Sequence, residues 1–248
     1  MFHRLAPYYD DLVGEKDYSA ESHYLETLAA RLGRSGGRAW LDVACGTGRH
    51  LSYLRHHYST AGVDVSPEML RMARRRLPGT RLVLGDMRTF RLKETFDVLS
   101  CLFSAIGHLE TERDLERTFS NFALHLKPGG VAIVEPWLDP GTFRRGYVHL
   151  VSRRGPSVTV ARMSISSRRG QHSEVHYHYL IGETGRRVEH FEEVSRGLMI
   201  SRNRLLDLME GAGLRARFLG RGLTRGRGLL VGLKAPSSRR AGAPSGGP

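Results

Sequence analysis

The feature that most constrains the fold is an apolar run that ends in a turn of very small residues. The letters AWLDV, at residues 39–43, are followed by ACGTG, and a helical pattern begins near Leu51. A buried strand that turns into a helix through alanine and glycine exposes its backbone to a ligand, because no large side chain covers the turn. The run is a poor dinucleotide fingerprint, because Leu51 stands where G-x-G-x-x-G has its third glycine. On this run alone, an ordinary tight turn remains an alternative.

The first 137 residues alternate expected strands with expected helices. Five short apolar runs have the composition of strands buried on both faces of a parallel sheet: AWLDVAC, TAGVDV, RLVLGDM, FDVLSCLF and GGVAIVEPW. Ser66, with a proline after it, and Thr111, with Asp114 three residues later, are expected helix N-caps. We expect another helix at about residues 21–32, and KPGG at residues 127–130 is expected to end a helix. This alternation predicts a three-layer, Rossmann-like α/β fold.

The middle of the chain lacks helical spacing and predicts an inserted antiparallel β layer. SVTVARMSI and SEVHYHYL alternate apolar with polar residues, and the turn-rich stretches SRRG and GETGRR lie beside them. Ser201 then caps a helix, and two last strands are expected near ARFLG and GLLVGLKA. The expected division is an α/β domain at 1–137 and 201–236, the antiparallel insertion at 138–200, and a disordered tail at 237–248.

Length and composition exclude several classes of protein. The 248 residues are enough to bury a self-sufficient core. The two cysteines, Cys45 and Cys101, fit no disulfide framework and no paired metal-ligand spacing. No segment reaches the ~20 continuous apolar residues of a membrane span, and the first residues contain no apolar leader. We therefore expect a cytoplasmic protein without a membrane segment.

The charge is divided unevenly along the chain. Residues 1–137 carry a formal net charge of +1, whereas residues 138–248 carry +12. Such asymmetry predicts an anionic partner for the second part, either nucleic acid or a small phosphorylated molecule. A solvated basic face is the plain alternative.

Acidic residues stand at the ends of the strands that follow the small-residue turn. Asp64 ends the second strand, 22 residues after Asp42, where a carboxylate can accept from both ribose hydroxyls of a nucleoside. Asp86 follows the third strand and can accept from an adenine amine, while the Met87 amide donates to a ring nitrogen. Phe103, after the fourth strand, would complete the rim of the crevice. Each aspartate alone is an ordinary loop or cap residue, but the series predicts a nucleoside site.

These motifs resemble those of a known enzyme family. DVACGTG, the second-strand acid, GDM and the next strand beginning FD resemble the class I S-adenosylmethionine-dependent methyltransferases. Longer motifs resemble the dTDP-3-amino-sugar N,N-dimethyltransferases, which build desosamine-type or mycaminose-type deoxysugars for macrolides. They are YYD, KDYSAE, CLFSAIGHL, VEPW, GYV, EVHY, VEHFE and GRGLLVG, spread over nearly the whole chain.

The resemblance implies a cofactor, a substrate and the residues that contact them. The cofactor would be S-adenosyl-L-methionine, and the substrate would be a dTDP-linked amino deoxysugar that is methylated once or twice. Family members are dimers, so the inserted strands are expected to be a substrate lid and a dimer seam. Cofactor contacts are expected at Tyr18, Ala44, Gly46, Gly48, Asp64, Asp86, Met87 and Leu102. Substrate contacts are expected at Tyr9, Glu135, Trp137, Phe143, Tyr147, Arg162 and Arg227.

This chain departs from the family pattern at a few positions. The family commonly has glutamate at position 64, methionine at 102 and tryptophan at 138, where this chain has Asp64, Leu102 and Leu138. It also has proline and serine before GRG, where this chain reads LTR. The departures bear on the identity of the sugar more than on the cofactor.

Methyl transfer to an amine mainly requires positioning, which supplies ~7–11 kcal/mol of the barrier. The amine must first lose its ammonium proton, and His108 is the expected acceptor because the ordinary histidine pKa is ~6.5. Tyr9 would orient the same nitrogen, and Tyr9, Tyr18, Phe103 and Trp137 are candidate aromatic neighbours of the sulfonium. A merely pocket-shaping role for His108 is equally compatible with the sequence. Arg162 and Arg227 would bind the diphosphate with paired donors.

Polar residues recur at every second position of one inserted strand. Glu174, His176 and His178 share one face of that strand, opposite Val175 and Tyr177. A metal site is conceivable, but a polar, solvent-facing strand is the favoured interpretation, and the family resemblance implies no metal.

Three other functions compete with an amino-sugar methyltransferase. A nucleic-acid methyltransferase would use the same fold and the basic charge. However, base-amine methylases carry N/D/S-P-P-Y/F after the fourth strand, where this chain reads FSAIGH, and neither cysteine follows a proline as in cytosine-C5 enzymes. A catalytically silent interaction partner is disfavoured by the intact turn and aspartates. A methyltransferase for another small molecule is the runner-up.

Overall fold

The α/β part of the molecule is built on one seven-stranded sheet. The computed structural model describes residues 8, 10, 16–224 and 226–236, so Tyr9 and the expected tail at 237–248 lie outside the described residues. The strand order is β10-β11-β5-β4-β1-β2-β3. Strands β1 to β5 are mutually parallel, and β11 is antiparallel to both of its neighbours. The strands are β1 (Ala39–Val43), β2 (Ser59–Asp64), β3 (Arg81–Leu84), β4 (Phe96–Cys101), β5 (Leu126–Val134), β10 (Leu214–Leu219) and β11 (Leu229–Lys234).

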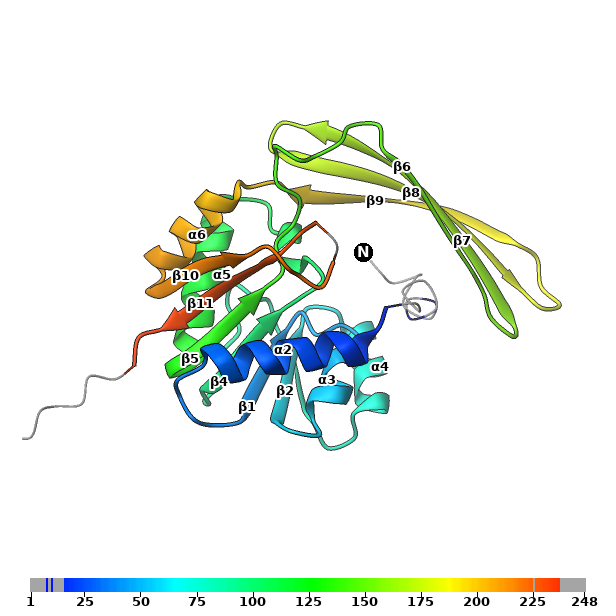
Figure 1. Ribbon diagram of the computed structural model, residues 1–248. Coiled ribbons are helices and arrows are strands. Elements are labelled where there is room, and N and C mark those ends of the chain that lie inside the picture. Colours follow the sequence, from blue (N-terminus) through cyan, green and yellow to red (C-terminus); the bar gives the residue numbers. More distant parts are fainter. Residues whose placement is uncertain (1–7, 9, 11–15, 225, 237–248) are drawn as a thin grey trace, which may run out of the picture.

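Helices cover both faces of this sheet. They are α2 (Tyr18–Leu32), α3 (Arg49–Leu54), α4 (Pro67–Arg76), the short 3-10 helix η2 (Ala105–His108), α5 (Glu112–His125) and α6 (Arg202–Gly211). Alternate residues of β1 belong to different cores: Trp40 packs with the α2 residue Leu25, whereas Leu41 packs with the α5 residue Phe119. Both sides of the strand are therefore buried, as a continuous apolar run predicts. Figure 1 shows α2 on one face and α5 and α6 on the other.

The predicted helix starts are largely confirmed. The side-chain oxygens of Ser66, Thr111 and Ser201 accept from backbone amides at the starts of α4, α5 and α6. The helix expected at 21–32 begins earlier, at Tyr18, because the Asp17 carboxylate accepts from the Ala20 amide at 2.9 Å. The helix expected to stop at KPGG does so: α5 ends at His125 with Leu126 as its C-cap, directly before this stretch, although residues 127–130 are also assigned to β5.

A second sheet follows β5 and extends away from the helices that flank the first (Figure 1). Its four antiparallel strands are β6 (Val148–Arg154), β7 (Val158–Arg169), β8 (His172–Glu183) and β9 (Glu189–Leu198), in that order. The predicted fold class, an α/β sheet with an inserted antiparallel β layer, is confirmed.

The cross-strand register gives the second sheet two distinct faces. One face, called the inner face, carries Tyr147, Arg162, Tyr177 and Tyr179, and it includes Ser173, which contacts Trp137. The other face, called the outer face, carries exposed apolar residues together with histidines. Its residues include Val148, Leu150, Met163, Ile165, His176, His178, Leu180, His190, Glu192 and Val194.

Candidate active site

The carboxyl ends of β1, β2, β4 and β5 meet at one edge of the first sheet, near the second sheet. The 3-10 helix η2, which follows β4, contacts β9. The chain leaving β5 passes through Trp137, which contacts β8 and β9. This edge is where open α/β sheets bind ligands. The inner face of the second sheet borders it.

The small-residue turn after β1 has the left-handed backbone that its composition predicts. Ala44, Gly46 and Gly48 have φ values of 58°, 54° and 75°. A β-carbon added at Gly46 would meet no heavy atom of the described residues within 4 Å, whereas one at Gly48 would lie 2.6 Å from Leu77 Cδ1. Gly48 is therefore required by packing against the end of α4. Gly46 borders open space, so the turn leaves room for a group that lies against its backbone.

Asp64 ties the end of β2 to this turn. Its Oδ2 accepts from the Gly46 amide at 2.7 Å, and its Oδ1 accepts from the Ser66 amide at 2.8 Å. The side chain is buried, and this burial raises the pKa of Asp64, although the backbone hydrogen bonds oppose the shift. A carboxylate has about four acceptor sites, and a third backbone hydrogen bond comes from Val65, so about one site remains for a ligand. The geometry fits an adenosine whose ribose lies over the turn.

Asp86 is held by an arginine that sequence reasoning missed. Arg88 Nη2 lies 2.6 Å from Asp86 Oδ2, and Arg88 Nη1 lies 3.0 Å from Asp114 Oδ1 on α5. Hydrogen bonding to Arg88 lowers the pKa of Asp86. The only sequence signal was the spacing of two residues between Asp86 and Arg88. The neighbouring Met87 is half-buried, and its carbonyl accepts from Asn121 Nδ2 at 3.1 Å.

Tyr18 opens α2 beside the turn. It is buried, and this burial raises its pKa to about 12. Its ring meets the His50 ring edge-on at 4.8 Å, and the Arg49 guanidinium lies 5.1 Å from its centroid. His50 in turn hydrogen-bonds Glu21 at 2.8 Å. The start of α2 is thereby fastened to the start of α3.

Asp10 fastens the N-terminal segment to the same turn. Its Oδ1 accepts from Thr47 Oγ1 at 2.9 Å, and its Oδ2 lies 2.5 Å from Arg76 Nη2. Arg76 also donates to the Thr47 carbonyl, and Arg49 Nε lies 3.4 Å from Asp10. Asp10 belongs to the YYD motif, but no local pattern predicts its partners, which lie 37 and 66 residues away along the chain. The neighbouring Tyr9, an expected site residue, lies outside the described residues.

The end of β4 has a strained backbone. Phe103 and Ser104 have φ values of 53° and 58°, which side-chain-bearing residues rarely adopt. The Phe103 amide donates to Glu135 Oε2 at 2.7 Å, and Ser104 Oγ donates to the Pro136 carbonyl at 2.7 Å. The Phe103 ring is 44% exposed, and Lys16 Nζ lies 4.3 Å from its centroid. The ring therefore lies on the rim of the crevice, whereas the preceding Leu102 is buried in the α2 core.

His108 ends η2 and faces β9. His108 is exposed to solvent, yet desolvation by nearby protein atoms lowers its pKa, while a hydrogen bond with the Arg196 backbone opposes the shift. A lowered pKa keeps the imidazole neutral at neutral pH. The group is thus in the form that can accept a proton.

Glu135 acts on the backbone around the site. It is completely buried, and its two oxygens accept from the amides of Phe103 at 2.7 Å and Thr224 at 3.1 Å. The carboxylate thus fixes the loop between β10 and β11 against the end of β4. That loop carries Arg227, which donates to Ser104 Oγ and lies 4.8 Å above the Trp137 ring. Burial lowers the pKa of Arg227, whereas the Glu135 charge opposes the shift.

Trp137 joins the two sheets. Its Nε1 donates to Ser173 Oγ on β8 at 2.8 Å. Added β-carbons at Gly107 and Gly197 would both lie 2.6 Å from atoms of its indole, Cγ and Cε2 respectively. The indole is therefore packed between η2 and β9, where any larger side chain would collide with it.

The inner face supplies the remaining expected substrate residues. Arg162 lies 5.3 Å from the Tyr177 ring, and its Nε is buried without a hydrogen-bond partner among the described residues. Tyr147 is 54% exposed and stacks on His149, while Phe143 is half-buried in the preceding loop. The inner face thus presents aromatic rings and one arginine whose Nε is unpaired within the described part of the chain.

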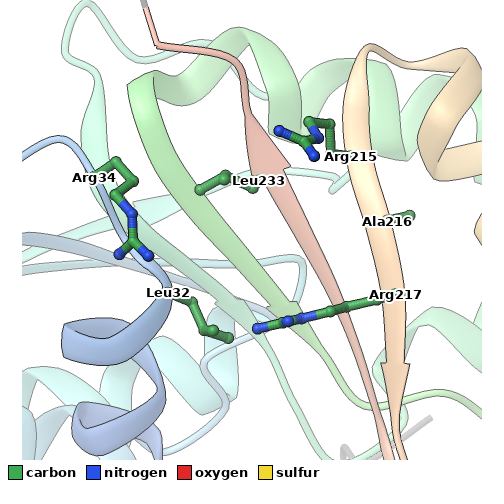
Figure 2. A pocket seen from close by; sticks show the side chains of 6 residues that line it. All are labelled: Leu32, Arg34, Arg215, Ala216, Arg217 and Leu233. Carbon is green, nitrogen blue, oxygen red and sulfur yellow. The ribbon is translucent and has the colours of Figure 1, made fainter.

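A hollow in the structure lies elsewhere. It has a volume of about 360 Å³ and is found between the end of α2 and strands β10 and β11, away from the carboxyl edge (Figure 2). Its lining consists of Leu32, Arg34, Arg215, Ala216, Arg217 and Leu233. None of these was an expected site residue. In addition, no helix in the described part of the chain is long and apolar enough to cross a bilayer.

Known proteins match this chain over most of its length. Residues 41–130 match the family model described as a methyltransferase domain. The dTDP-3-amino-3,4,6-trideoxy-alpha-D-glucopyranose N,N-dimethyltransferase of Streptomyces venezuelae is 40% identical over 89% of this chain and 92% of its own length. The dTDP-4-amino-2,3,4,6-tetradeoxy-D-glucose N,N-dimethyltransferase of Saccharopolyspora spinosa is 37% identical over 88% of this chain and 87% of its own.

A solved structure extends the similarity to both sheets. It is that of CalS10 with bound S-adenosylmethionine, an amino pentose methyltransferase from Micromonospora echinaspora involved in calicheamicin biosynthesis. The TM-score is 0.84 at 33% identity, over 95% of this chain and 98% of that one. S-adenosylmethionine is therefore the cofactor of this protein. The chain belongs to the family of dTDP-amino-sugar N,N-dimethyltransferases.

Proposed function

We propose that this protein transfers one or two methyl groups from S-adenosylmethionine to the amine of a dTDP-linked amino deoxysugar in antibiotic biosynthesis. The observation that carries the proposal is the extent of the similarity. The methyltransferase-domain match covers only residues 41–130, whereas the amino-sugar methyltransferases match 89% of the chain and therefore include the second sheet. A shared cofactor fold alone would not extend into that sheet.

The turn after β1 and the acids near it are proposed to hold the cofactor. When bound, S-adenosylmethionine supplies a methyl group on a sulfonium sulfur. Asp64 keeps about one free acceptor site for the ribose, and the space over Gly46 admits the nucleoside. Asp86 accepts hydrogen bonds from Arg88, so it is a weaker acceptor for a ligand than an unpaired carboxylate would be. The proposed cofactor residues are Tyr18, Ala44, Gly46, Gly48, Asp64, Asp86, Met87 and Leu102.

The inner face and the loop before β11 are proposed to hold the nucleotide sugar. The buried Nε of Arg162 has no partner among the described residues, so a diphosphate oxygen would satisfy it. Arg227 lies on Trp137 and lines the same side of the crevice. Glu135 is proposed to act by positioning Phe103 and the loop, because its oxygens are occupied by backbone amides. Tyr9, Trp137, Phe143 and Tyr147 complete the proposed substrate contacts.

His108 is proposed to take the proton that the substrate ammonium loses before attack. The lowered pKa keeps the ring neutral, and its position between η2 and β9 is at the border of the crevice. Tyr9 is proposed to orient the same amine.

We further propose a role for each part of the chain and an oligomeric state. Residues 1–137 and 201–236 would bind the cofactor, and residues 138–200 would form a substrate lid. The outer face carries exposed apolar side chains on adjacent strands, among them Leu150, Met163 and Val194, and such a patch marks a contact surface. A homodimer formed through this face is proposed. The partners would include no nucleic acid and no membrane, and the enzyme would act in the cytoplasm.

Mass spectrometry of candidate substrates tests the activity. The protein is incubated with S-adenosylmethionine and with dTDP-linked 3-amino or 4-amino deoxysugars. Gains of one and two methyl groups on one of these sugars are expected. Cofactor binding without methylation of any amino sugar would contradict the substrate class and favour another small molecule. No cofactor binding would contradict the activity as a whole.

A further inference from the structure

Two histidines and a glutamate converge on the outer face, at a place that the proposed reaction does not use. His178 on β8 pairs directly with Glu192 on β9, and His190 pairs with Leu180, so the three side chains occupy neighbouring rows of the same face. Their ligand atoms, one per residue, all lie within 4.8 Å of one another. Sequence reasoning recognised His178 on this strand face but not its partners on β9.

The geometry of the three side chains matches a chelating site. His178 Nδ1 lies 3.3 Å from Glu192 Oε1, and His190 Nε2 lies 4.0 Å from the same oxygen. Around a tetrahedral zinc ion, with bonds of about 2.0–2.2 Å, neighbouring ligand atoms are about 3.3 Å apart. The His178–Glu192 pair already has this separation, and a small rotation of His190 would bring its nitrogen to it.

The backbone beneath the ligands is fixed, and the side chains are open to solvent. The two imidazoles stack in parallel, with centroids 5.8 Å apart and planes 3° apart, so one ring must turn about its side-chain bonds for both nitrogens to face one ion. Both strands belong to a continuous antiparallel ladder, which fixes the backbone beneath the ligands. All three side chains are exposed, so an ion can enter from solvent. Two exposed apolar residues of the same face adjoin the cluster, because Met163 pairs with His178 and Leu180 pairs with His190, so the site would border the proposed dimer contact.

From this arrangement we propose that His178, His190 and Glu192 form a binding site for a divalent transition metal, with zinc as the preferred ion. Imidazole and carboxylate together suit zinc, nickel and copper better than magnesium or calcium, which prefer oxygen ligands. Three protein ligands leave one position of a tetrahedral ion for water. The ion would clamp β8 to β9 on the face opposite the substrate residues.

Zinc titration of untagged, chelator-treated full-length protein tests the site. Isothermal calorimetry should show saturable binding of one zinc ion per chain. His190→Ala and Glu192→Gln should each weaken it about ten-fold or more, because loss of even an outer-shell partner costs 10- to 100-fold. His57→Ala is the matched control: His57 is also exposed, but it pairs with a single carboxylate, Glu26, at 2.9 Å. This control should bind zinc as the parent does.

Cobalt supplies a second readout that does not depend on affinity. Cobalt bound by the parent protein should give the visible absorption of a four- or five-coordinate ion, and His178→Ala should abolish it. Equal zinc binding by the parent and His190→Ala would overturn the proposal. An equal loss in His57→Ala, or a cobalt spectrum unchanged by His178→Ala, would also overturn it. These substitutions alter exposed side chains, and a circular dichroism spectrum verifies that each variant is folded.

Discussion

Asp64 hydrogen-bonds the backbone and is also proposed to bind the cofactor ribose, so a substitution there affects both interactions. It accepts from the Gly46 amide in the turn after β1 and from the Ser66 amide after β2, and the Val65 backbone adds a third hydrogen bond. The turn and the ligand therefore depend on the same carboxylate. Its burial makes each of these hydrogen bonds stronger than an exposed one.

Asp64→Ala is expected to weaken cofactor binding about ten- to a hundred-fold. Hydrogen bonds to charged groups contribute about 1.5–3 kcal/mol, and each 1.4 kcal/mol is a factor of about ten in affinity. Asp64→Glu, which keeps a carboxylate, should retain most of the affinity. Calorimetry with S-adenosylmethionine measures both variants, with thermal unfolding as the check of folding. Unchanged affinity in Asp64→Ala would remove the ribose assignment.

His125 is a buried side chain whose hydrogen bonds define its protonation state. Its Nε2 accepts from the Leu92 amide at 3.0 Å, and its Nδ1 faces the Asn121 carbonyl at 2.8 Å, which requires the Nδ1-protonated neutral ring. The side chain is 3% exposed, and desolvation lowers its pKa. A second proton would both charge a buried ring and break the bond to Leu92.

The free energy of unfolding should fall as the pH drops below about 6.5, the ordinary histidine pKa in the unfolded chain. The folded pKa of His125 is lower, so its contribution is complete above 6.5 and is lost as the pH falls through the folded value. His125→Gln should show a smaller loss between pH 7 and pH 5 in urea unfolding. His108 shifts in the same direction and contributes equally to both proteins. Identical pH dependence in the two proteins would contradict this role of His125.

At the scale of elements, Trp137 is the side chain through which the second sheet meets the first. It touches η2 through Gly107 and β9 through Gly197, and it hydrogen-bonds β8. Neither glycine has a positive φ, so the nearby indole, and not the backbone conformation, requires glycine at both positions. A methyl group at either position would displace the ring.

Gly197→Ala is expected to raise the KM for the amino sugar while leaving the cofactor Kd unchanged. Overpacking of this kind costs about 1–3 kcal/mol, and here it acts on Trp137 and, through it, on Arg227. Gly182→Ala is the matched control, because its β-carbon would make only an ordinary contact, 3.6 Å from Val188. Steady-state kinetics and cofactor calorimetry measure the two effects. A Gly197→Ala variant that behaves like Gly182→Ala would show that the indole does not shape the substrate site.

Local sequence patterns predicted most helices and strands. The features that they did not predict depend on contacts between residues far apart in the sequence. Ser66, Thr111 and Ser201 were recognised because a cap acts within three residues of itself. The extension of β5 back to Leu126 was not expected, because residues 127–130 fall within a register shift between the Phe96–Leu126 and Val98–Val131 pairs, which no local pattern contains. Asp10 contacts Thr47, 37 residues away, and Glu135 contacts Thr224, 89 residues away. No local pattern contains such contacts.

At the scale of the whole molecule, the second sheet has an inner face that is proposed to bind substrate and an outer face whose apolar side chains stay exposed among the described residues. The outer face exposes 45–59% of several apolar side chains, including Leu150, Met163 and Ile165. A standard interface buries about 800 Å² of the surface of each partner. The proposed dimer would cover these side chains.

Met163→Glu is expected to convert the dimer into a monomer, because the charge would be buried without a partner in the interface. Sedimentation should then give a mass near 27.8 kDa, against twice that value for the parent. Leu124→Glu is the control, since Leu124 is a similarly exposed residue on α5. A parent that sediments as a monomer would contradict the dimer.

The position of the indole between the sheets also has an optical consequence. The chain contains two tryptophans, and Trp40 is fully enclosed in the α2 core, with its Nε1 bonded to Ser100. In Trp40→Phe, all tryptophan emission would come from Trp137, beside the guanidinium of Arg227. Quenching or spectral shifts would then follow the closure of the inserted strands over a nucleotide sugar in real time, without any attached dye.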